Sequence, residues 1–219
     1  IISVETGHIH VHETGATEAI GHKIHTVSSE DGKLKVADIQ QILDLHTDVH
    51  MVIPKAVYIS NSTEVGNIYS KNELTDLSQF CRLNDLYLFL DGARLGAALT
   101  SKYSDITLAE ISQLVDIFYI GGTKNGALFG EAIVITNSKL KDHFRYYLKQ
   151  KGALLAKGRV LGIQFLELFK DDLFFHLAQH ANQMAELLAQ GIQDLQYSFL
   201  SIPQTNQIFP ILPNQLIEQ

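Results

Sequence analysis

Two polar motifs in the middle of the chain each follow a short apolar run. Residues 91–94 read Asp-Gly-Ala-Arg after the run 87–90, and residues 121–126 read Gly-Gly-Thr-Lys-Asn-Gly after the run 117–120. Both runs are continuously apolar, which predicts strands buried on both faces of a parallel sheet. Ligands bind outside the carboxyl ends of such strands. A carboxylate there can keep a ring nitrogen protonated, and a lysine there can form a Schiff base with an aldehyde.

The rest of the chain supplies the elements that would position these motifs. Strand-like runs alternate with helical patterns, which is typical of an α/β fold with a mostly parallel sheet sandwiched by helices. Val36 begins one helical stripe, and Ser70 with Glu73 three residues later has the pattern of a helix N-terminus. We expect Asn137 to open a third helix. The strand-like runs are residues 24–27, 56–60, 86–90, 117–120 and 132–136.

The two ends of the chain differ from this alternating pattern. Residues 1–4 look like the middle of a strand, so we expect the natural N-terminus to lie further upstream. From Lys157 onward the pattern becomes long and helical, and residues 200–210 resemble a hairpin. We therefore predict a large domain over residues 1–155, followed by linking helices and the start of a small α+β domain over residues 156–219.

Composition narrows the class of protein. Of the 219 residues, 46% are hydrophobic and 19% are charged, which is ordinary for a soluble globular chain. The formal net charge of −7, without clustered basic residues, argues against broad nucleic-acid binding. No apolar run approaches the roughly 20 residues that span a bilayer, and no basic export signal opens the chain. The single cysteine, Cys81, excludes an internal disulfide and is typical of a reducing compartment, so we expect a cytoplasmic protein.

Three sequence elements together resemble the threonine aldolase and β-eliminating lyase family. They are residues 6–16 (Thr-Gly-His-Ile-His-Val-His-Glu-Thr-Gly-Ala), the motif at 91–94 and the Gly-Thr-Lys of residues 122–124. The resemblance extends roughly over residues 4–188. It implies pyridoxal 5'-phosphate (PLP) as cofactor and the PLP-dependent transferase-like large domain of aspartate aminotransferase as fold. It also implies a small amino acid as substrate, and a homodimer or homotetramer with active sites at the subunit boundary.

The resemblance implies a role for individual residues. Lys124 corresponds to the Schiff-base lysine, and Asp91 to the carboxylate that pairs with the pyridinium nitrogen of the cofactor. His8 corresponds to the imidazole that stacks on the cofactor ring and takes the proton of a substrate hydroxyl. Arg94 corresponds to an arginine near the substrate carboxylate, and Thr123 offers its hydroxyl to the cofactor phosphate. Simpler structural roles compete with these: a lysine beside a glycine turn, a carboxylate that caps a turn, and an arginine in an ion pair.

The chain departs from the family's pattern in three places. Residues 61–66 read Asn-Ser-Thr-Glu-Val-Gly where the family has an Asn-Thr-His-Asn type of segment, so the expected substrate-side histidine is absent. The glycine-rich loop with a second arginine is altered at residues 151–159, where Arg159 is the candidate for binding the substrate carboxylate. The family's Gly-Thr phosphate-binding turn is expected upstream of Ile1, so we expect this stretch of chain by itself to retain the cofactor poorly.

Three alternating histidines form a second candidate site. In an extended backbone His8, His10 and His12 would point to one face and could bind zinc. No cysteine or carboxylate cluster accompanies them as a second set of ligands, and a helix that starts at Glu13 would turn His12 away. We therefore predict no metal, and we expect His10, His12 and His22 to pack against neighbours or to face a subunit interface.

The predicted activity is the PLP-dependent cleavage of a small β-hydroxy amino acid, such as threonine, to glycine and an aldehyde. The same carbanion chemistry would serve β-elimination, racemisation or transamination, because the surroundings of the α-carbon decide which bond breaks. A non-catalytic scaffold that kept the fold is the alternative from another class of protein. A hydrolase that uses a metal bound by the histidines is a third.

Overall fold

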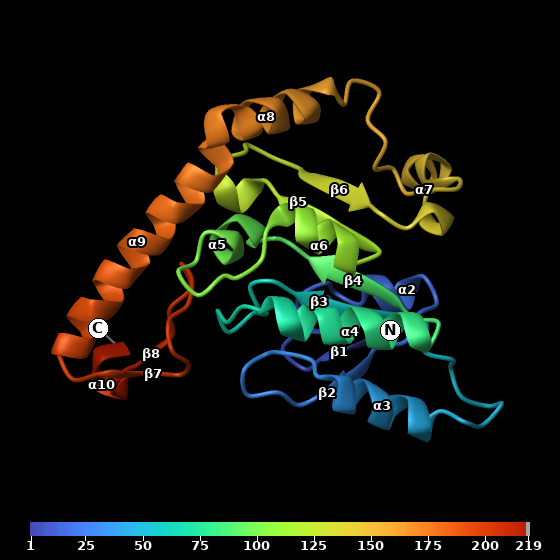
Figure 1. Cartoon of the computed structure of the whole chain (residues 1–219), viewed down its shortest axis with the longest axis horizontal. Helices are drawn as coiled ribbons and strands as arrows, with labels where there is room; N and C mark the ends of the chain where they lie inside the picture. Colours follow the sequence, from blue (N-terminus) through green and yellow to red (C-terminus); the bar gives the residue numbers. More distant parts are fainter. Residues whose placement is uncertain (218–219) are drawn as a thin grey trace.

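The computed structural model describes residues 1–217, which form one six-stranded sheet flanked by helices (Figure 1). The order across the sheet is β2-β1-β3-β4-β5-β6, and β1 to β5 are all parallel. The predicted α/β fold with a mostly parallel sheet is therefore confirmed. The strands are β1 (Ile2–Val4), β2 (His25–Val27), β3 (Ala56–Ser60), β4 (Tyr87–Asp91), β5 (Ile117–Gly121) and β6 (Glu131–Ile135).

The last strand of this sheet, β6, runs antiparallel to β5. The connection between them contains a single 3₁₀ turn, η1 (Thr123–Asn125), in place of a crossover helix. A parallel return requires a connection of about a dozen residues or more, so this short loop can only send the chain straight back. The apolar run at 132–136 thus predicts the strand, and its antiparallel direction agrees with the predicted mostly parallel sheet.

Helices cover the sheet, and three of those in the connections between strands lie side by side along it in Figure 1. These are α3, α4 and α6, and the first two begin at or next to the positions that the sequence predicts. The helices are α1 (His8–Val11), α2 (Ala16–Ala19), α3 (Val36–Leu45), α4 (Lys71–Leu83), α5 (Leu95–Leu99), α6 (Leu108–Leu114), α7 (Phe144–Gln150), α8 (Arg159–Phe169), α9 (Leu173–Asp194) and α10 (Asn214–Ile217), with 3₁₀ turns η2 (Ser138–Leu140) and η3 (Lys170–Asp172).

Two predicted helix starts have different outcomes. Ser70 begins α4 with a capping box, in which its hydroxyl accepts from the N–H of Glu73 at 3.3 Å and the Glu73 carboxylate accepts from the N–H of Ser70 at 2.7 Å. A cap of this kind contributes about 1 kcal/mol. Asn137 caps only the 3₁₀ turn η2, and α7 begins later, after His143 adopts a left-handed φ of 60°. The expected α-helix at Asn137 is therefore wrong.

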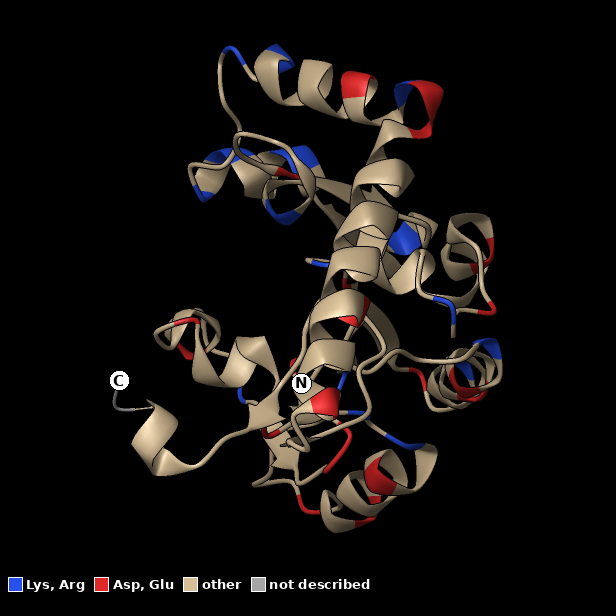
Figure 2. Ribbon diagram, turned by 90° about the vertical axis from the view of Figure 1, so that its left-hand side faces the viewer, with Lys and Arg blue, Asp and Glu red and all other residues tan. Residues whose placement is uncertain are grey.

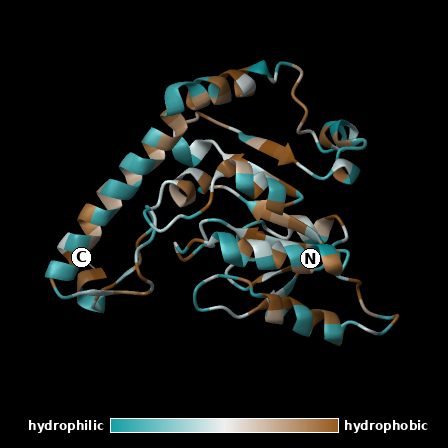
Figure 3. Cartoon of the chain, viewed as in Figure 1, coloured by the Kyte–Doolittle hydropathy of each residue, from teal (hydrophilic) through white to brown (hydrophobic). Residues whose placement is uncertain are grey.

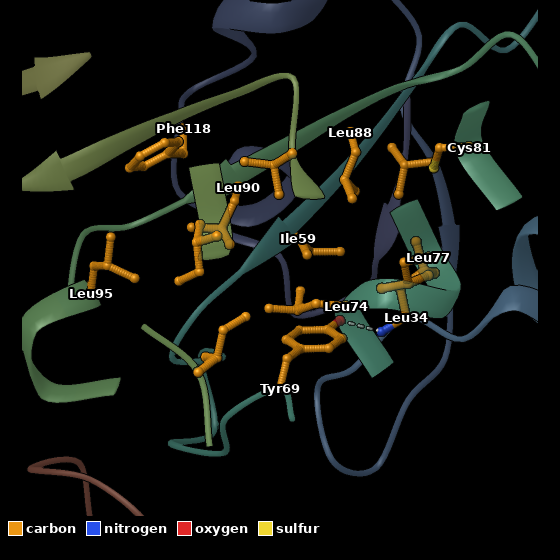
Figure 4. Packing of buried hydrophobic residues seen from close by; sticks show 14 of the residues in the cluster. Leu34, Ile59, Tyr69, Leu74, Leu77, Cys81, Leu88, Leu90, Leu95 and Phe118 are labelled. Carbon is orange, nitrogen blue, oxygen red and sulfur yellow. Dashed lines mark hydrogen bonds between the residues drawn. The ribbon is translucent and has the colours of Figure 1, made fainter. Parts of the chain in front are cut away.

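The hydrophobic core lies between the parallel strands and the helices that cover them. Leu88 and Leu90 of β4 pack in one cluster with Leu74 of α4 (Figure 4). Burying one such leucine contributes about 1.5–3 kcal/mol. A polar contact lies within the cluster, because the backbone N–H of Leu34 donates to the hydroxyl of Tyr69 at 2.6 Å. Figure 3 shows the hydrophobic strands at the centre and hydrophilic residues along the outer helices.

Two long helices follow the sheet, so the helical prediction from Lys157 onward is confirmed. The α9 helix packs along α5, where Asn182 donates to the backbone oxygen of Ala97 at 2.9 Å. Phe174, at the start of α9, is fully buried, and its backbone oxygen accepts from the side chain of Asn125 at 2.8 Å. The α9 helix thereby supports both α5 and the loop that follows β5.

The chain then forms a small hairpin. Strand β7 (Ser198–Phe199) pairs antiparallel with β8 (Pro210–Ile211), so the hairpin predicted over 200–210 is confirmed, with one strand just before that range and the other at its end. The intervening loop returns to the main sheet domain, because the hydroxyl of Ser101 donates to the backbone oxygen of Gln204 at 2.6 Å and Thr205 donates to that of Gly66 at 3.1 Å. The division of the chain near residue 155 stays a prediction.

Basic residues are clustered in one part of the chain, contrary to the expectation from the sequence. A local group of basic residues surrounds α7 (Figure 2): Lys139, Lys141, Arg145, Lys149 and Lys151. The α9 helix, by contrast, has no lysine or arginine, and its acidic residues are Glu186 and Asp194. Among residues 1–217, no helix combines the length and the apolar character that crossing a bilayer requires.

Candidate active site

Four residues singled out by the sequence line one hollow at the carboxyl edge of the sheet. His8 follows β1, and Asp91 is the last residue of β4. Arg94 lies just before α5, and Lys124 lies in the turn η1 after β5. The hollow has a volume of about 80 Å³. The other residues that line it are Glu13, Ser60, Ser62, Glu64, Ala93 and Tyr119.

Asp91 is a buried carboxylate that is held from two sides. The backbone N–H of Ala93 donates to its Oδ1 at 2.9 Å, and the hydroxyl of Tyr58 donates to its Oδ2. Burial, and then the nearby Asp91, raise the pKa of both Tyr58 and Tyr119 well above the usual value of a phenol. Both phenols therefore stay neutral donors. Asp91 fulfils the structural role of a turn cap, and it also faces the hollow.

The two tyrosines beside Asp91 were not predicted from the sequence. Ser60 is the partner of Asp91 in the pairing of β3 with β4, so Tyr58, two residues earlier, lies on the same face as Asp91. Phe89 stacks on Tyr58 with ring centroids 5.4 Å apart, and Tyr119 lies 6.1 Å from Phe89 on the other side. The alternation of side chains along each strand shows which residues share a face with Asp91. It identifies the two tyrosines as neighbours of Asp91 only when the order of the strands is known.

His8 is held at its backbone and at its ring. Its N–H donates to Oε1 of Glu64 at 2.9 Å, and its Nδ1 lies 2.7 Å from Oε1 of Glu13. An ionised carboxylate has no hydrogen to donate, so in this contact Nδ1 of His8 is the donor and Glu13 is the acceptor. In the neutral imidazole, Nε2 then carries no hydrogen. Because His8 begins the short helix α1, the three histidines do not have the extended backbone that would point them to one face. In the helix, the rings of His8 and His12 lie one turn apart at 5.0 Å.

Glu64 is a further carboxylate in the hollow that the sequence did not single out. Its Oε1 accepts from the hydroxyl of Ser60 at 2.6 Å, in addition to the N–H of His8. Its Oε2 is buried and has no hydrogen-bond partner among residues 1–217. It lies in the segment 61–66, where the resemblance implies a histidine. The only signal in the sequence was the polar run that follows β3.

The loop that carries Lys124 is determined by backbone packing. A Cβ on Gly121 would lie 2.1 Å from the backbone oxygen of Ala93, and one on Gly92 would lie 1.9 Å from that of Tyr119. These glycines are therefore required by the close approach of the chain after β4 to the end of β5, and not by an approach to a cofactor. Lys124 itself is exposed.

The remaining predicted residues lie in different positions. The hydroxyl of Thr123 donates to Oε1 of Glu131 at 3.2 Å, while the N–H of Gly122 donates to Oε2 of the same side chain at 2.6 Å. Thr123 is thus next to the hollow but does not line it. Arg94 lines the hollow and forms no ion pair within residues 1–217. Arg159 is exposed at the start of α8 and is not part of the hollow.

A metal site and a second hollow were the other candidates for a functional site. Among residues 1–217, no three His, Cys, Asp or Glu side chains are grouped closely enough to hold a metal ion. A larger hollow of about 400 Å³ lies between α9 and the segment 202–205, and amide side chains such as Gln179 and Gln183 line much of it. We place the candidate site at the smaller hollow, because a lysine, an imidazole and carboxylates converge there.

A parallel sheet whose carboxyl edge carries a lysine, an imidazole and carboxylates around one hollow defines an α/β protein with a ligand site at that edge. The family model described as Beta-eliminating lyase matches residues 1–214. The chain therefore belongs to the β-eliminating lyase family, as the resemblance of its motifs predicts.

Individual relatives agree with this assignment. The chain is 36% identical to a low specificity L-threonine aldolase of Pseudomonas sp. (strain NCIMB 10558), over all of this chain and 62% of that protein. The structure of a threonine aldolase from Leishmania major matches with a TM-score of 0.97 and 53% identity, over 99% of this chain and 64% of the other. A PLP-dependent aminotransferase from Streptococcus suis matches in fold alone, with a TM-score of 0.68 and 16% identity over 94% and 53% of the two chains. The chain thus spans somewhat less than two thirds of the length of the two threonine aldolases.

Proposed function

We propose that this protein is a PLP-dependent lyase that cleaves a small β-hydroxy amino acid, such as threonine, to glycine and an aldehyde. The observation that carries the proposal is the convergence of His8, Asp91, Arg94 and Lys124, from separate segments, on one hollow. Membership of the β-eliminating lyase family and the similarity to two threonine aldolases support it.

The donors and acceptors of the hollow fit PLP. Asp91 offers an acceptor-only carboxylate for a protonated ring nitrogen, with the neutral phenol of Tyr58 and the backbone N–H of Ala93 as its other partners. Lys124 lies across the same hollow as the amine that would hold the aldehyde carbon. Next to it, Thr123 would donate its hydroxyl to the phosphate after leaving Glu131. PLP, when bound, supplies an electron sink for the carbanion that forms at the α-carbon of an amino acid.

The other residues would bind and orient the substrate. Arg94 has a planar guanidinium that suits a bidentate contact with the substrate carboxylate. Arg159 would act as a second carboxylate ligand only if the segment before α8 moved toward the hollow. His8, with its ring held by Glu13, would lie against the face of the cofactor ring. Asp91 would keep the hydrogen on the ring nitrogen, which maintains the electron sink during bond cleavage.

We also propose that the protein is a cytoplasmic homodimer or homotetramer. Tyr146 and Tyr147 of α7 are 76% and 60% exposed, which supports an interface role for these two side chains over a place in the core. The single cysteine, which is buried, agrees with a reducing compartment. Sedimentation or light scattering of the purified protein tests the assembly, and a monomer at micromolar concentration would contradict it.

An absorption spectrum tests the cofactor directly. The protein is mixed with PLP and scanned between about 300 and 500 nm, beside Lys124→Ala. We expect a visible band in the wild type that is lost in Lys124→Ala. Lys139→Ala, a substitution of a basic residue near α7, is the matched control and should keep the band. If the protein that includes the segment expected upstream of Ile1 showed no band, this would contradict the proposed enzyme and favour a non-catalytic scaffold.

A further inference from the structure

We propose that Glu64 takes the hydroxyl proton of the substrate, an inference that rests on the PLP-dependent cleavage proposed above. Glu64 follows β3 and lines the same hollow as Asp91 and Lys124. One of its oxygens has two hydrogen-bond donors, and the other has none among residues 1–217. The side chain therefore presents an acceptor oxygen for which this part of the protein supplies no donor.

The geometry around Glu64 determines which oxygen is available. The hydroxyl of Ser60 and the N–H of His8 both donate to Oε1, at 2.6 and 2.9 Å. These two hydrogen bonds fix the orientation of the carboxylate and leave Oε2 without a partner among residues 1–217. A buried polar atom without a partner costs about 1–3 kcal/mol, and more if it is charged. A substrate hydroxyl that donates to Oε2 would offset this cost and would at the same time be positioned for proton transfer.

Glu64 is better placed for this role than His8. The imidazole of His8 is 43% exposed, and its Nδ1 is bound to Glu13. The free oxygen of Glu64 is shielded from solvent, so water competes less for it. We therefore leave His8 as the residue that covers the cofactor ring, and we move the role of proton acceptor from His8 to Glu64.

The proposed step balances in atoms and electrons. The substrate O–H bond breaks, its proton forms a bond to Oε2 of Glu64, and its electron pair forms the second carbon–oxygen bond of the aldehyde. The Cα–Cβ bond breaks at the same time, and its electron pair remains at the α-carbon, which the cofactor stabilises. One proton is then returned to the α-carbon, and glycine and the aldehyde leave. No oxidant or reductant takes part.

The test exploits a reaction of the same site that does not involve a hydroxyl. Glycine has no β-carbon, so the exchange of its α-proton with deuterium requires PLP and Lys124 but no acceptor for a hydroxyl proton. Glu64→Gln keeps an oxygen that can accept from Ser60 and His8, and replaces Oε2 by an amide nitrogen that cannot take a proton. The exposed carboxylate of Glu5 supplies the matched control, Glu5→Gln.

For PLP-loaded Glu64→Gln we expect threonine cleavage to fall by about 100-fold or more, in line with the loss of a general base. The visible absorption band and the glycine exchange rate should stay within about threefold of wild type, and the unfolding midpoint of the cofactor-free protein should not change. Cleavage that persists within threefold, or cleavage and exchange that fall in parallel, would overturn the role of Glu64. A wild-type protein without a visible band would instead overturn the proposed function, together with this inference.

A second variant keeps the inference testable if Glu64→Gln does not fold. Ser60→Ala removes one of the two hydrogen bonds that hold Oε1 of Glu64, so we expect the rate of threonine cleavage to fall while the rate of glycine exchange stays unchanged. Cleavage and exchange that fall in parallel in Ser60→Ala would overturn the role of Glu64.

Discussion

The hydroxyl of Tyr58 donates a hydrogen bond to Oδ2 of Asp91 across two neighbouring strands. The register of β3 and β4 brings them together, because it pairs Ser60 with Asp91 and places Tyr58 on the same face. Since burial raises the pKa of Tyr58, the phenol keeps its hydrogen and acts as a donor only to this carboxylate. Asp91 therefore has a partner for each oxygen before any ligand binds.

This contact predicts the effect of Tyr58→Phe on stability. We expect the free energy of unfolding of the cofactor-free protein to fall by about 1.5–3 kcal/mol, the usual contribution of a hydrogen bond to a charged group. The stacked contact with Phe89 is retained, so the loss reports the hydroxyl. Urea unfolding measures it. Tyr146→Phe, at a residue that is 76% exposed, should stay within about 0.5 kcal/mol of wild type, and equal losses in the two variants would contradict the prediction.

Gly121→Ala tests the close approach of the chain segments beneath the site. The new Cβ would lie 2.1 Å from the backbone oxygen and 2.5 Å from the carbonyl carbon of Ala93. Because both are backbone atoms, the segments must separate, and we expect a loss of about 3 kcal/mol or more. Gly162→Ala in α8 meets no atom within 4 Å and should stabilise the protein by about 0.5–1 kcal/mol. Thermal unfolding that lowered the midpoint equally in both variants would refute this difference.

His25 predicts a dependence of stability on pH. Burial, and then the charges of His46 and Lys23, lower the pKa of His25 to about 4. Unfolded histidine titrates near pH 6.5, so between about pH 6.5 and 4 the unfolded state binds more protons than the folded state. The contribution of His25 is therefore fully present above pH 6.5 and is lost as the pH falls. Urea unfolding of His25→Gln at pH 7 and pH 5 should show a smaller loss than wild type, and identical losses would exclude His25 as the cause.

The sequence determined the strands, their polar ends and the identity of several residues at the site. The reason is local: a continuous apolar run predicts a buried strand, and the residue that follows it lies at the sheet edge whatever the neighbours are. Asp91 and Lys124 could be placed in this way. The capping box at Ser70 could be predicted for the same reason, since its atoms lie within one helical turn.

Only the tertiary structure decided which side chains meet across strands. Tyr58 contacts Asp91, and Glu64 contacts His8, over long separations in the sequence, and each pairing depends on the strand order and register. The helical backbone of His8 also depends on what surrounds a short segment that has only a weak preference of its own. Local patterns carry no information about neighbours that are distant in the sequence, so the partners of the predicted residues became visible only when the sheet was assembled.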